Sequence, residues 1–339
     1  MRQVWITRAG GPEVLEVREA PDPRPAAGEV RVRVRAAGLN FADVMARQGL
    51  YPDAPKPPCV VGYEVAGVVD EVGPGADESL AGRRVLALTR FGGHADTVCV
   101  PAPHVVELPD GLDFPAAAAI PVNYLTAYHM LFRVAHLRPG AHVLVHMAAG
   151  GVGIAVLQLC RTVAGVVTYG TASAGKHAAL RAEGCGHPID YRRADYAVEV
   201  RRLTGGRGVD LVLDPLGGRD WRKGMGLLAP VGHLIAFGFA NMARGERRSL
   251  ARVVRQGLRV PLLTPLGLMS ANRSVSGVHI GHLWDEIPML RAEAQAVLEL
   301  WRDGAVAPRV DAAFPFDQAG DAHQRLSRRQ NIGKVVLVP

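Results

Sequence analysis

Near the middle of the chain, small residues follow a short apolar run at a spacing that suits a phosphate group. Residues 143–145 are Val-Leu-Val and predict a buried strand, and Ala148-x-Gly150-x-x-Gly153 follows at the start of a helical pattern. Small side chains here let the backbone turn tightly and approach a pyrophosphate on the amino-terminus of the helix. A strand, this motif and a helix in that order predict a dinucleotide-binding turn, with a purely structural glycine turn as the alternative.

The end of the next predicted strand distinguishes the two nicotinamide dinucleotides. An NAD site carries an acidic residue about 20 positions after the motif, where it binds the ribose hydroxyls. Residues 169–173 read Tyr-Gly-Thr-Ala-Ser, without an acid, and Lys176 follows. Ser173 and Lys176 could hold a 2′-phosphate, and Tyr191 could add a hydroxyl. We therefore expect NADPH rather than NADH; the alternative is that Ser173 and Lys176 only begin a helix, with Ser173 as its cap.

Two different patterns of elements must position these residues. Residues 30–34 alternate between Val and Arg, which predicts a half-buried strand, and apolar runs at 65–72 and 85–88 continue a β-rich region. From about residue 123, strands alternate with helices, which indicates βαβ units and a parallel sheet. The strands predicted there are 143–145, 165–169, 189, 209–213 and 234–237, and the helices are 176–183, 196–203 and 221–228. A helix near 286–302 and a strand at 333–338 end the chain.

Composition and charge exclude several classes of protein. The 339 residues predict two domains at about 150 residues each. Lys and Arg number 39 against 32 Asp and Glu, but the charges are scattered and only 6% of residues are aromatic, so we expect no nucleic-acid partner. We see no apolar run near the roughly 20 residues that span a bilayer, no secretory signal and no close pair of cysteines, which together predict a cytoplasmic protein.

Several further motifs occur in order along nearly the whole chain. They are Ala36-Ala-Gly-Leu-Asn40-Phe-Ala-Asp43, Arg47-x-Gly49-x-Tyr51, Asn123-Tyr-Leu-Thr126-Ala-Tyr128, His146-Met-Ala-Ala-Gly-Gly-Val-Gly153, Gly170-Thr-Ala-Ser-x-x-Lys176, His187-Pro-Ile-Asp-Tyr191, Asp214-Pro-Leu-Gly-Gly218 and Asn331-Ile-Gly-Lys334. With these motifs the chain resembles the zinc-independent quinone oxidoreductase group of medium-chain dehydrogenases/reductases. Within that group it is most similar to proteins related to the synaptic vesicle membrane protein VAT-1.

The resemblance implies an α/β protein of two domains. Residues 1–122 and 286–339 would form a GroES-like, β-rich catalytic domain. Residues 123–285 would form a Rossmann domain, a doubly wound parallel sheet that binds NADPH in the cleft between the domains. Members of the group are often dimers through an edge strand of this sheet, so we expect a homodimer through residues 275–280.

The resemblance also bears on metals. Zinc-dependent members carry Cys and His where this chain has Asn40 and Tyr63, and an amide and a phenol are poor zinc ligands. The four clustered cysteines of a structural zinc lobe are also missing from the sequence. His279-x-x-His282 is a local histidine pair. We therefore expect no metal.

Without zinc, the chemistry favours a conjugated acceptor, because its electrons delocalise without a Lewis acid. We expect a hydride to pass from NADPH to a quinone or to the β-carbon of an enone, with a hydrogen-bond donor stabilising the developing enolate. Asn40 and Tyr51, then Tyr63, are the candidate catalytic residues, and solvent is an alternative proton source. Asp43 is expected to hold local structure.

The cofactor site implied by the resemblance draws on several motifs. Thr126 could contact the nicotinamide ring or cap a helix. The complete set of candidate cofactor-binding residues is Asn40, Thr126, Ala149, Gly150, Gly151, Val152, Gly170, Thr171, Ser173, Lys176, Tyr191, Phe237 and Asn331.

One basic segment, residues 243–268, interrupts the alternation of strands and helices as a helical insertion in the Rossmann domain. Its residues Arg244, Arg247, Arg248, Arg252, Arg255 and Arg259 face Leu250, Val253, Val254 and Leu258 at helical spacing. We expect the apolar side to pack on the protein itself, for instance as a lid, and we expect no membrane association. A basic amphipathic helix that lies on a membrane is the alternative.

Three functions remain open at this point. The leading one is an NADPH-dependent reductase of a small-molecule quinone or enone. The second is a dedicated enoyl reductase of one natural-product pathway. The third, from another class, is an NADPH-binding protein with little catalysis that associates with a membrane or a protein partner. The sequence does not name the acceptor.

Overall fold

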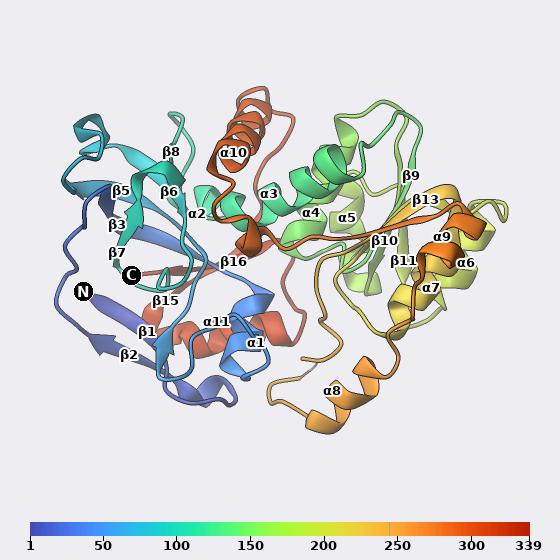
Figure 1. The fold of residues 1–339 in the computed structure, drawn as a ribbon, viewed down its shortest axis with the longest axis horizontal. Coiled ribbons are helices and arrows are strands. Elements are labelled where there is room, and N and C mark those ends of the chain that lie inside the picture. The colour runs from blue at the N-terminus through green and yellow to red at the C-terminus, as the bar shows by residue number, and fades with distance from the viewer. Residues whose placement is uncertain (244) are drawn as a thin grey trace. The chain divides into compact units, whose positions relative to one another are not determined.

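The computed structural model describes residues 1–243 and 245–339, which form two compact units (Figure 1). The first unit consists of Met1–Leu125, Ala243, residues 245–248 and Ile280–Pro339. The second unit consists of Thr126–Met242 and Ser249–His279. Arg244, one of the six arginines of the basic segment, lies outside the described residues.

The first unit is built on two sheets. A small sheet has the order β2-β1-β4, and a larger one has the order β15-β16-β3-β5-β6-β8, with β7 also paired to β3. The strands are β1 (Arg2–Ile6), β2 (Leu15–Glu19), β3 (Glu29–Leu39), β4 (Cys59–Val60), β5 (Glu64–Val72), β6 (Arg84–Leu88), β7 (Thr97–Pro101), β8 (Val105–Glu107), β15 (Val310–Pro315) and β16 (Lys334–Val338). The helices are α1 (Phe41–Arg47), α2 (Phe114–Ala117), α10 (Ile287–Arg302) and α11 (Ala319–Ser327).

The alternation predicted from residue 30 onward is confirmed in β3. Val30, Val32 and Val34 are buried in the core, whereas Arg31 and Arg33 point the other way and both pair with Asp70. β3 is longer than predicted and continues to Leu39. Because its two sides pair with different strands, its carboxyl end lies at the junction of three segments of the chain.

Two strand pairings bring distant residues to that end of β3. β16 runs antiparallel to β3 with Val335 opposite Leu39, so Lys334 lies beside the residue that follows β3. β5 runs antiparallel to the other side of β3 with Val65 opposite Ala37, which brings Glu64 to the same place. The first unit therefore gathers Asn40, Glu64 and Lys334 at one end of its large sheet.

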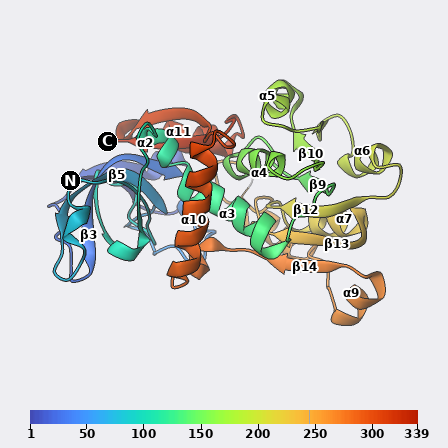
Figure 2. The ribbon, with the colours of Figure 1, turned by 90° about the horizontal axis from the view of Figure 1, so that it is seen from above.

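The second unit contains a six-stranded parallel sheet in the order β11-β10-β9-β12-β13-β14, with helices packed around it (Figure 2). The strands are β9 (His142–Val145), β10 (Val167–Ala172), β11 (His187–Asp190), β12 (Val209–Asp214), β13 (Leu228–Ala236) and β14 (Ser274–Gly277). The helices are α4 (Gly151–Arg161), α5 (His177–Ala182), α6 (Tyr196–Leu203), α7 (Arg219–Leu227), α8 (Leu250–Gly257) and α9 (Pro265–Ala271). A helical segment, Ile120–Val134, includes α3 (Leu125–Tyr128) and joins the units in sequence.

This strand order is that of a doubly wound Rossmann sheet, with the first strand next to the centre and crossovers on either side of it. The predicted strands all appear, although β10 begins and ends two to three residues later than predicted. Leu144, Tyr169, Val212 and Leu234 are buried between sheet and helices. Parallel strands have their carboxyl ends at one edge, which is where ligands bind in such sheets.

The basic segment departs from the prediction in two ways. Residues 245–248 belong to the first unit, where Gln48 Nε2 donates to Gly245 O at 2.9 Å and Arg328 Nε lies 2.9 Å from Glu246 Oε1. Most of the apolar side of α8 is exposed and does not pack on the described part of the chain: Leu250 is 61% exposed and Leu258 83%, whereas Val253 is partly buried. The expected packing was wrong because helical spacing shows which side is apolar but not what covers it.

Candidate functional site

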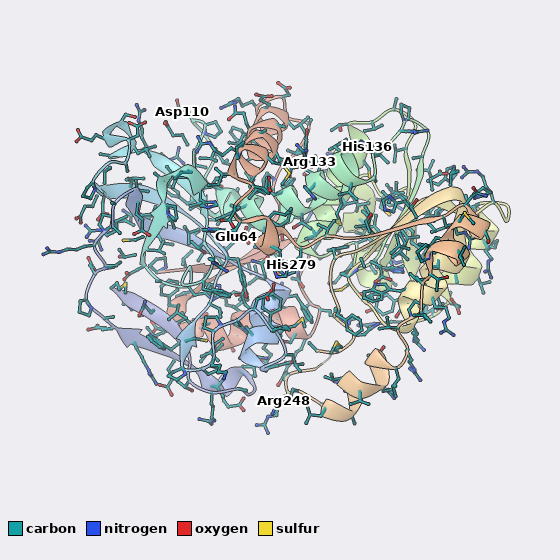
Figure 3. All side chains as sticks on the ribbon, viewed as in Figure 1. Glu64, Asp110, Arg133, His136, Arg248 and His279 are labelled. Atoms are coloured by element: carbon teal, nitrogen blue, oxygen red, sulfur yellow. The ribbon has the colours of Figure 1, made fainter. Side chains whose placement is uncertain are left out.

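Four buried polar side chains meet at the end of the large sheet in the first unit. Asn40 Nδ2 donates to Glu64 Oε1 at 2.8 Å, and Lys334 Nζ donates to Asn40 Oδ1 at 2.6 Å. Lys334 Nζ also contacts Glu64 Oε1 and lies 3.5 Å from Asn123 Oδ1. Glu64 (Figure 3) is fully buried, and Lys334 is only 2% exposed. A cation and an anion are thus held out of water at the two ends of one amide.

Asp43 fixes the backbone around this amide, as the sequence predicted. Its carboxylate accepts hydrogen bonds from Asn40 N at 2.7 Å and from Gly62 N at 3.1 Å, and His94 Nε2 lies 3.8 Å away. Burial raises the pKa of the Asp43 carboxyl, although the nearby His94 opposes the shift. Asp43 therefore joins the start of α1 to the loop before β5.

Tyr51 and Tyr63, the other candidate catalytic residues, lie together in the first unit. Their rings form an edge-to-face pair with centroids 6.0 Å apart. Burial raises the pKa of both hydroxyls above the ordinary tyrosine value, so both stay protonated at neutral pH. The Tyr63 hydroxyl is buried without a hydrogen-bond partner among the described residues. Both tyrosines can therefore act as neutral hydrogen-bond donors.

In the second unit, the predicted dinucleotide turn lies between β9 and α4. Met147 adopts a left-handed backbone (φ 52°), and Gly150 N donates to Met147 O at 2.8 Å, which closes the turn. Gly150 is the N-cap of α4, and Ala149, Gly151 and Val152 surround it. A Cβ on Gly153 would lie 2.5 Å from Ala148 O, so only glycine lets the helix start this close to the strand. The free backbone N–H groups at the start of α4 are the groups that bind phosphates.

The residues predicted to select the cofactor follow two neighbouring strands at this edge. Ser173 comes directly after β10 and Tyr191 directly after β11; Lys176 lies three residues beyond Ser173. All three are at least partly exposed, and no acidic residue ends β10. Ser173 occupies the N-cap position of the short 3-10 helix Ala174–Lys176, as the alternative expected, but its side chain makes no capping hydrogen bond.

Gly170 and Thr171, also predicted to bind the cofactor, lie in β10 and make contacts that stabilise the surrounding structure. A Cβ on Gly170 would lie 2.7 Å from Cys185 Sγ, and Thr171 Oγ1 accepts from Met147 N at 3.3 Å. Thr171 Oγ1 is also 3.1 Å from His146 Nδ1. These contacts hold the dinucleotide turn in place.

The remaining predicted cofactor residues are spread over both units. Phe237 follows β13 and is half-buried, with its N–H donating to Asp214 O at 3.1 Å. Thr126 is buried within the helical segment, so it does not cap a helix. Asn331, in the first unit, is buried, and its Nδ2 donates to Gly333 O at 2.8 Å.

Sequence reasoning missed Glu64, Lys334 and Asn123 as members of the site. Each lies in or beside a motif that the resemblance used, but no local spacing relates them to one another. Their residue types could have indicated a buried pair, because charged residues in apolar strands are almost never fully buried unless they are paired. Glu64 directly precedes the predicted apolar run 65–72, and Lys334 is the second residue of the predicted strand 333–338.

Comparisons with known proteins agree with this architecture. A family model described as an alcohol dehydrogenase GroES-like domain matches residues 26–110, and one described as zinc-binding dehydrogenase matches residues 184–337. A synaptic vesicle membrane protein VAT-1 homolog of Danio rerio is 46% identical over 99% of this chain and 69% of its own. A quinone oxidoreductase of Pseudomonas aeruginosa is 34% identical over 100% of this chain and 99% of its own. The chain belongs to the quinone oxidoreductase group of the medium-chain dehydrogenase/reductase family.

Solved structures of relatives extend over the whole chain. Escherichia coli quinone oxidoreductase complexed with NADPH covers 100% of both chains with a TM-score of 0.88 and 28% identity. A mycobacterial protein complexed with NADPH covers 100% of both chains with a TM-score of 0.87 and 31% identity. The CurK enoyl reductase covers 99% of this chain and 98% of its own, with a TM-score of 0.85 and 25% identity. The predicted GroES-like and Rossmann parts are confirmed.

Although one matching model is described as zinc-binding, the residues around Asn40 do not fit a zinc ion. Asn40 and Tyr63 stand where zinc-dependent members have ligands, and the Asn40 oxygen already accepts from the Lys334 ammonium. Of the local histidine pair, His282 Nε2 lies 2.8 Å from Asp53 Oδ2, within the first unit. A cation at Asn40 would be repelled by Lys334, so no step of the chemistry is assigned to a metal.

Proposed function

We propose that this protein is an NADPH-dependent, zinc-independent reductase of quinones or α,β-unsaturated carbonyl compounds. The end of β10 carries this proposal: Ser173 follows the strand where an NAD site would need an acid, and Lys176, three residues later, is a cation of the kind that binds a 2′-phosphate. The NADPH complexes of two relatives support the same choice of cofactor. The quinone oxidoreductases among its relatives support the class of acceptor.

The chemistry that the residues can perform matches such a reduction. When bound, NADPH would supply the hydride, and its addition to the β-carbon of an enone or to a quinone would leave negative charge on the acceptor oxygen. Asn40 and the neutral hydroxyl of Tyr51 are the donors that we propose stabilise that charge, and the buried hydroxyl of Tyr63 is a third candidate that we expect to contribute little. Water or a tyrosine hydroxyl then delivers the proton. Burial around Asn40 lowers the local dielectric, which strengthens such hydrogen bonds.

The test is cofactor binding followed by turnover. NADPH fluorescence is titrated against NADH, and NADPH consumption is then followed with a panel of quinones and enones. We expect NADPH to bind at least about tenfold more tightly, a difference of about 1.4 kcal/mol, and at least one panel member to be reduced. Failure of both cofactors to bind would contradict the proposal.

Two variants then separate the donors. Tyr51→Phe removes a hydroxyl and Asn40→Ala removes an amide, and we expect both to lower kcat more than they change the Kd for NADPH. Turnover restricted to one unusual enone would favour the alternative of a dedicated biosynthetic enoyl reductase, the kind of enzyme named in the CurK relative. We also propose a homodimer through the edge strand β14, which size-exclusion chromatography with light scattering tests.

A second function, association with an anionic membrane surface, is favoured by one observation. From Arg247 to Trp284 the chain has six arginines and no acidic residue. The exposed apolar residues of this stretch include Leu250, Val254, Leu258, Leu262, Leu266 and Met269. α9 projects from the edge of its sheet (Figure 2). Basic and apolar side chains together bind anionic lipid, and several relatives are named synaptic vesicle membrane proteins.

No described helix is long and apolar enough to cross a membrane. The test is therefore flotation with vesicles of neutral lipid, with and without an anionic lipid. Leu258→Ser combined with Leu262→Ser should abolish flotation, and Arg255→Gln with Arg259→Gln should remove its dependence on anionic lipid. Val198→Ser is the matched control, because Val198 is 60% exposed on α6, away from this stretch. Equal flotation of all variants would contradict this second function.

A further inference from the structure

The amide of Asn40 has a fixed orientation in the described structure. Its oxygen accepts from the Lys334 ammonium at 2.6 Å, and its nitrogen donates one hydrogen to Glu64 Oε1 at 2.8 Å. If the amide were flipped, its NH2 group would face the ammonium and its oxygen would face the carboxylate. Both contacts would then be repulsive, at places where little water can screen them. The two charges therefore select one of the two orientations.

The pair itself is anchored from several sides. Glu64 Oε2 accepts from Val122 N at 2.6 Å, and Lys334 Nζ has a second amide oxygen, that of Asn123, at 3.5 Å. Gly38 in β3 leaves the space that Glu64 fills, because a Cβ there would overlap the carboxylate. Glu64, Lys334 and Asn123 are 0%, 2% and 4% exposed, whereas Asn40 is 9% exposed. Asn40 is thus the most open member of the cluster.

One hydrogen of the Asn40 amide remains available. The second N–H of Nδ2 has no partner among the described residues. A cation on the amide oxygen and an anion on the first N–H both draw the amide toward its charge-separated form. Chains of hydrogen bonds polarise one another in this way, so the second N–H becomes a stronger donor.

We propose that Lys334 and Glu64 are positioning residues that orient and polarise Asn40, so that its second N–H donates to the acceptor oxygen on which charge develops. This inference rests on the proposed function. It adds two residues that contact no reacting atom and act only through Asn40. The expected consequence is a loss of kcat that depends on Asn40 being present.

The variant that tests this is Lys334→Met together with Glu64→Gln, which removes both charges at nearly constant volume. We expect its kcat for an enone or quinone to fall about 10–100-fold, with the Kd for NADPH changed by less than about twofold. Lys334→Arg keeps the cation and should restore part of kcat. The matched control is Arg325→Met with Asp311→Asn, a charge pair of the same unit outside the cluster, which should leave kcat unchanged.

The decisive measurement adds the double substitution to Asn40→Ala. If the pair acts through Asn40, kcat falls no further in this background, because the group that the pair positions is already gone. A further fall of the same size would show an independent structural role and overturn the inference. Thermal unfolding of every variant checks that the chain is folded.

A spectroscopic readout separates this inference from the proposed function. In protein labelled with ¹⁵N-asparagine, the Asn40 side-chain amide should give two distinct, slowly exchanging proton resonances, which move together in the double variant. If these signals appear but no acceptor is reduced, the oriented amide stands and the reductase function fails. If turnover is present and the Asn40 signals do not respond to the double substitution, the inference fails and the reductase function stands.

Discussion

The candidate residues of the first unit and those of the second unit are held in opposite ways. In the first unit, the Asn40 amide is held by two charged side chains that are almost completely buried and come from two separate strands, β5 and β16. In the second unit, the predicted dinucleotide turn after β9 is made of small residues, and only backbone N–H groups are offered at the start of α4. The arrangement around Asn40 therefore depends on which side chains are present, whereas the turn after β9 depends on its residues having small side chains or none.

This difference fits the ligand proposed for each unit, a dinucleotide for the turn after β9 and an acceptor for the residues around Asn40. A dinucleotide presents the same pyrophosphate every time, so a backbone cradle at a helix N-terminus is sufficient. The acceptor has to be stabilised at the one oxygen where charge develops, which calls for donors held in fixed positions. We therefore expect substitutions that add volume to affect cofactor binding most, and substitutions that remove polar groups to affect turnover most.

The largest effect is expected where a side chain is added to the backbone cradle. Gly153→Val places a Cβ only 2.5 Å from Ala148 O, which is too close, so the turn has to move. Overpacking of this kind costs about 1–3 kcal/mol, which corresponds to a loss of NADPH affinity of about 10–100-fold. Fluorescence titration measures it. Gly257→Ala is the control, because a Cβ at this position meets nothing within 4 Å. Equal NADPH affinity of the two variants would contradict the proposal that added volume in the turn weakens cofactor binding.

A smaller effect is expected at Lys176, the one charged residue among the predicted cofactor-binding residues. Lys176→Ala should weaken NADPH binding about tenfold, because a charge-assisted hydrogen bond to a partly exposed phosphate contributes about 1.5 kcal/mol. NADH lacks that phosphate, so its Kd should stay the same. Lys223→Ala serves as control, since Lys223 pairs with Asp195 on the same unit. Equal weakening of both cofactors would assign Lys176 a structural role.

Acid should act on the buried histidine of the first unit. Burial, with help from Arg47, lowers the pKa of His323 well below 6.5, so the unfolded chain binds a proton that the folded chain does not. Stability therefore rises with pH up to the unfolded pKa near 6.5, and below it falls by up to about 1.4 kcal/mol per pH unit. His323→Leu should flatten this slope in urea unfolding between pH 5 and 7. His136→Asn, at an exposed histidine (Figure 3), should not.

The smallest effect is expected at Tyr63. Its hydroxyl is buried and has no partner among the described residues, so Tyr63→Phe should raise the free energy of unfolding by up to about 1 kcal/mol. We expect kcat to stay within about twofold, which corresponds to a change in the activation barrier below about 0.5 kcal/mol. Tyr51 would then be the tyrosine that donates to the acceptor oxygen. A large loss of kcat in Tyr63→Phe would instead show that the Tyr63 hydroxyl donates to the acceptor, and would add Tyr63 to the donors of the first unit.

Much of the fold could be predicted because its signals are local. The alternation in residues 30–34 gave the right buried side of β3, and the alternating strands and helices after residue 123 gave the parallel sheet. The cofactor residues after β10 and β11 stay a prediction, although their place at the carboxyl edge agrees with it. The packing of α8 was predicted wrongly, because periodicity carries no information on the neighbouring surface.

By itself, the sequence determined the features that depend on neighbouring residues: the strand, small-residue turn and helix around Gly150, and the lack of an acid near Ser173. Only the tertiary structure decided how Asn40 is held. Glu64 is 24 positions away and Lys334 is 294 positions away, and both reach Asn40 because β5 and β16 pair with β3. Strand register is set by long-range hydrogen bonding and by which side is buried, and no spacing along the chain encodes which strands become neighbours.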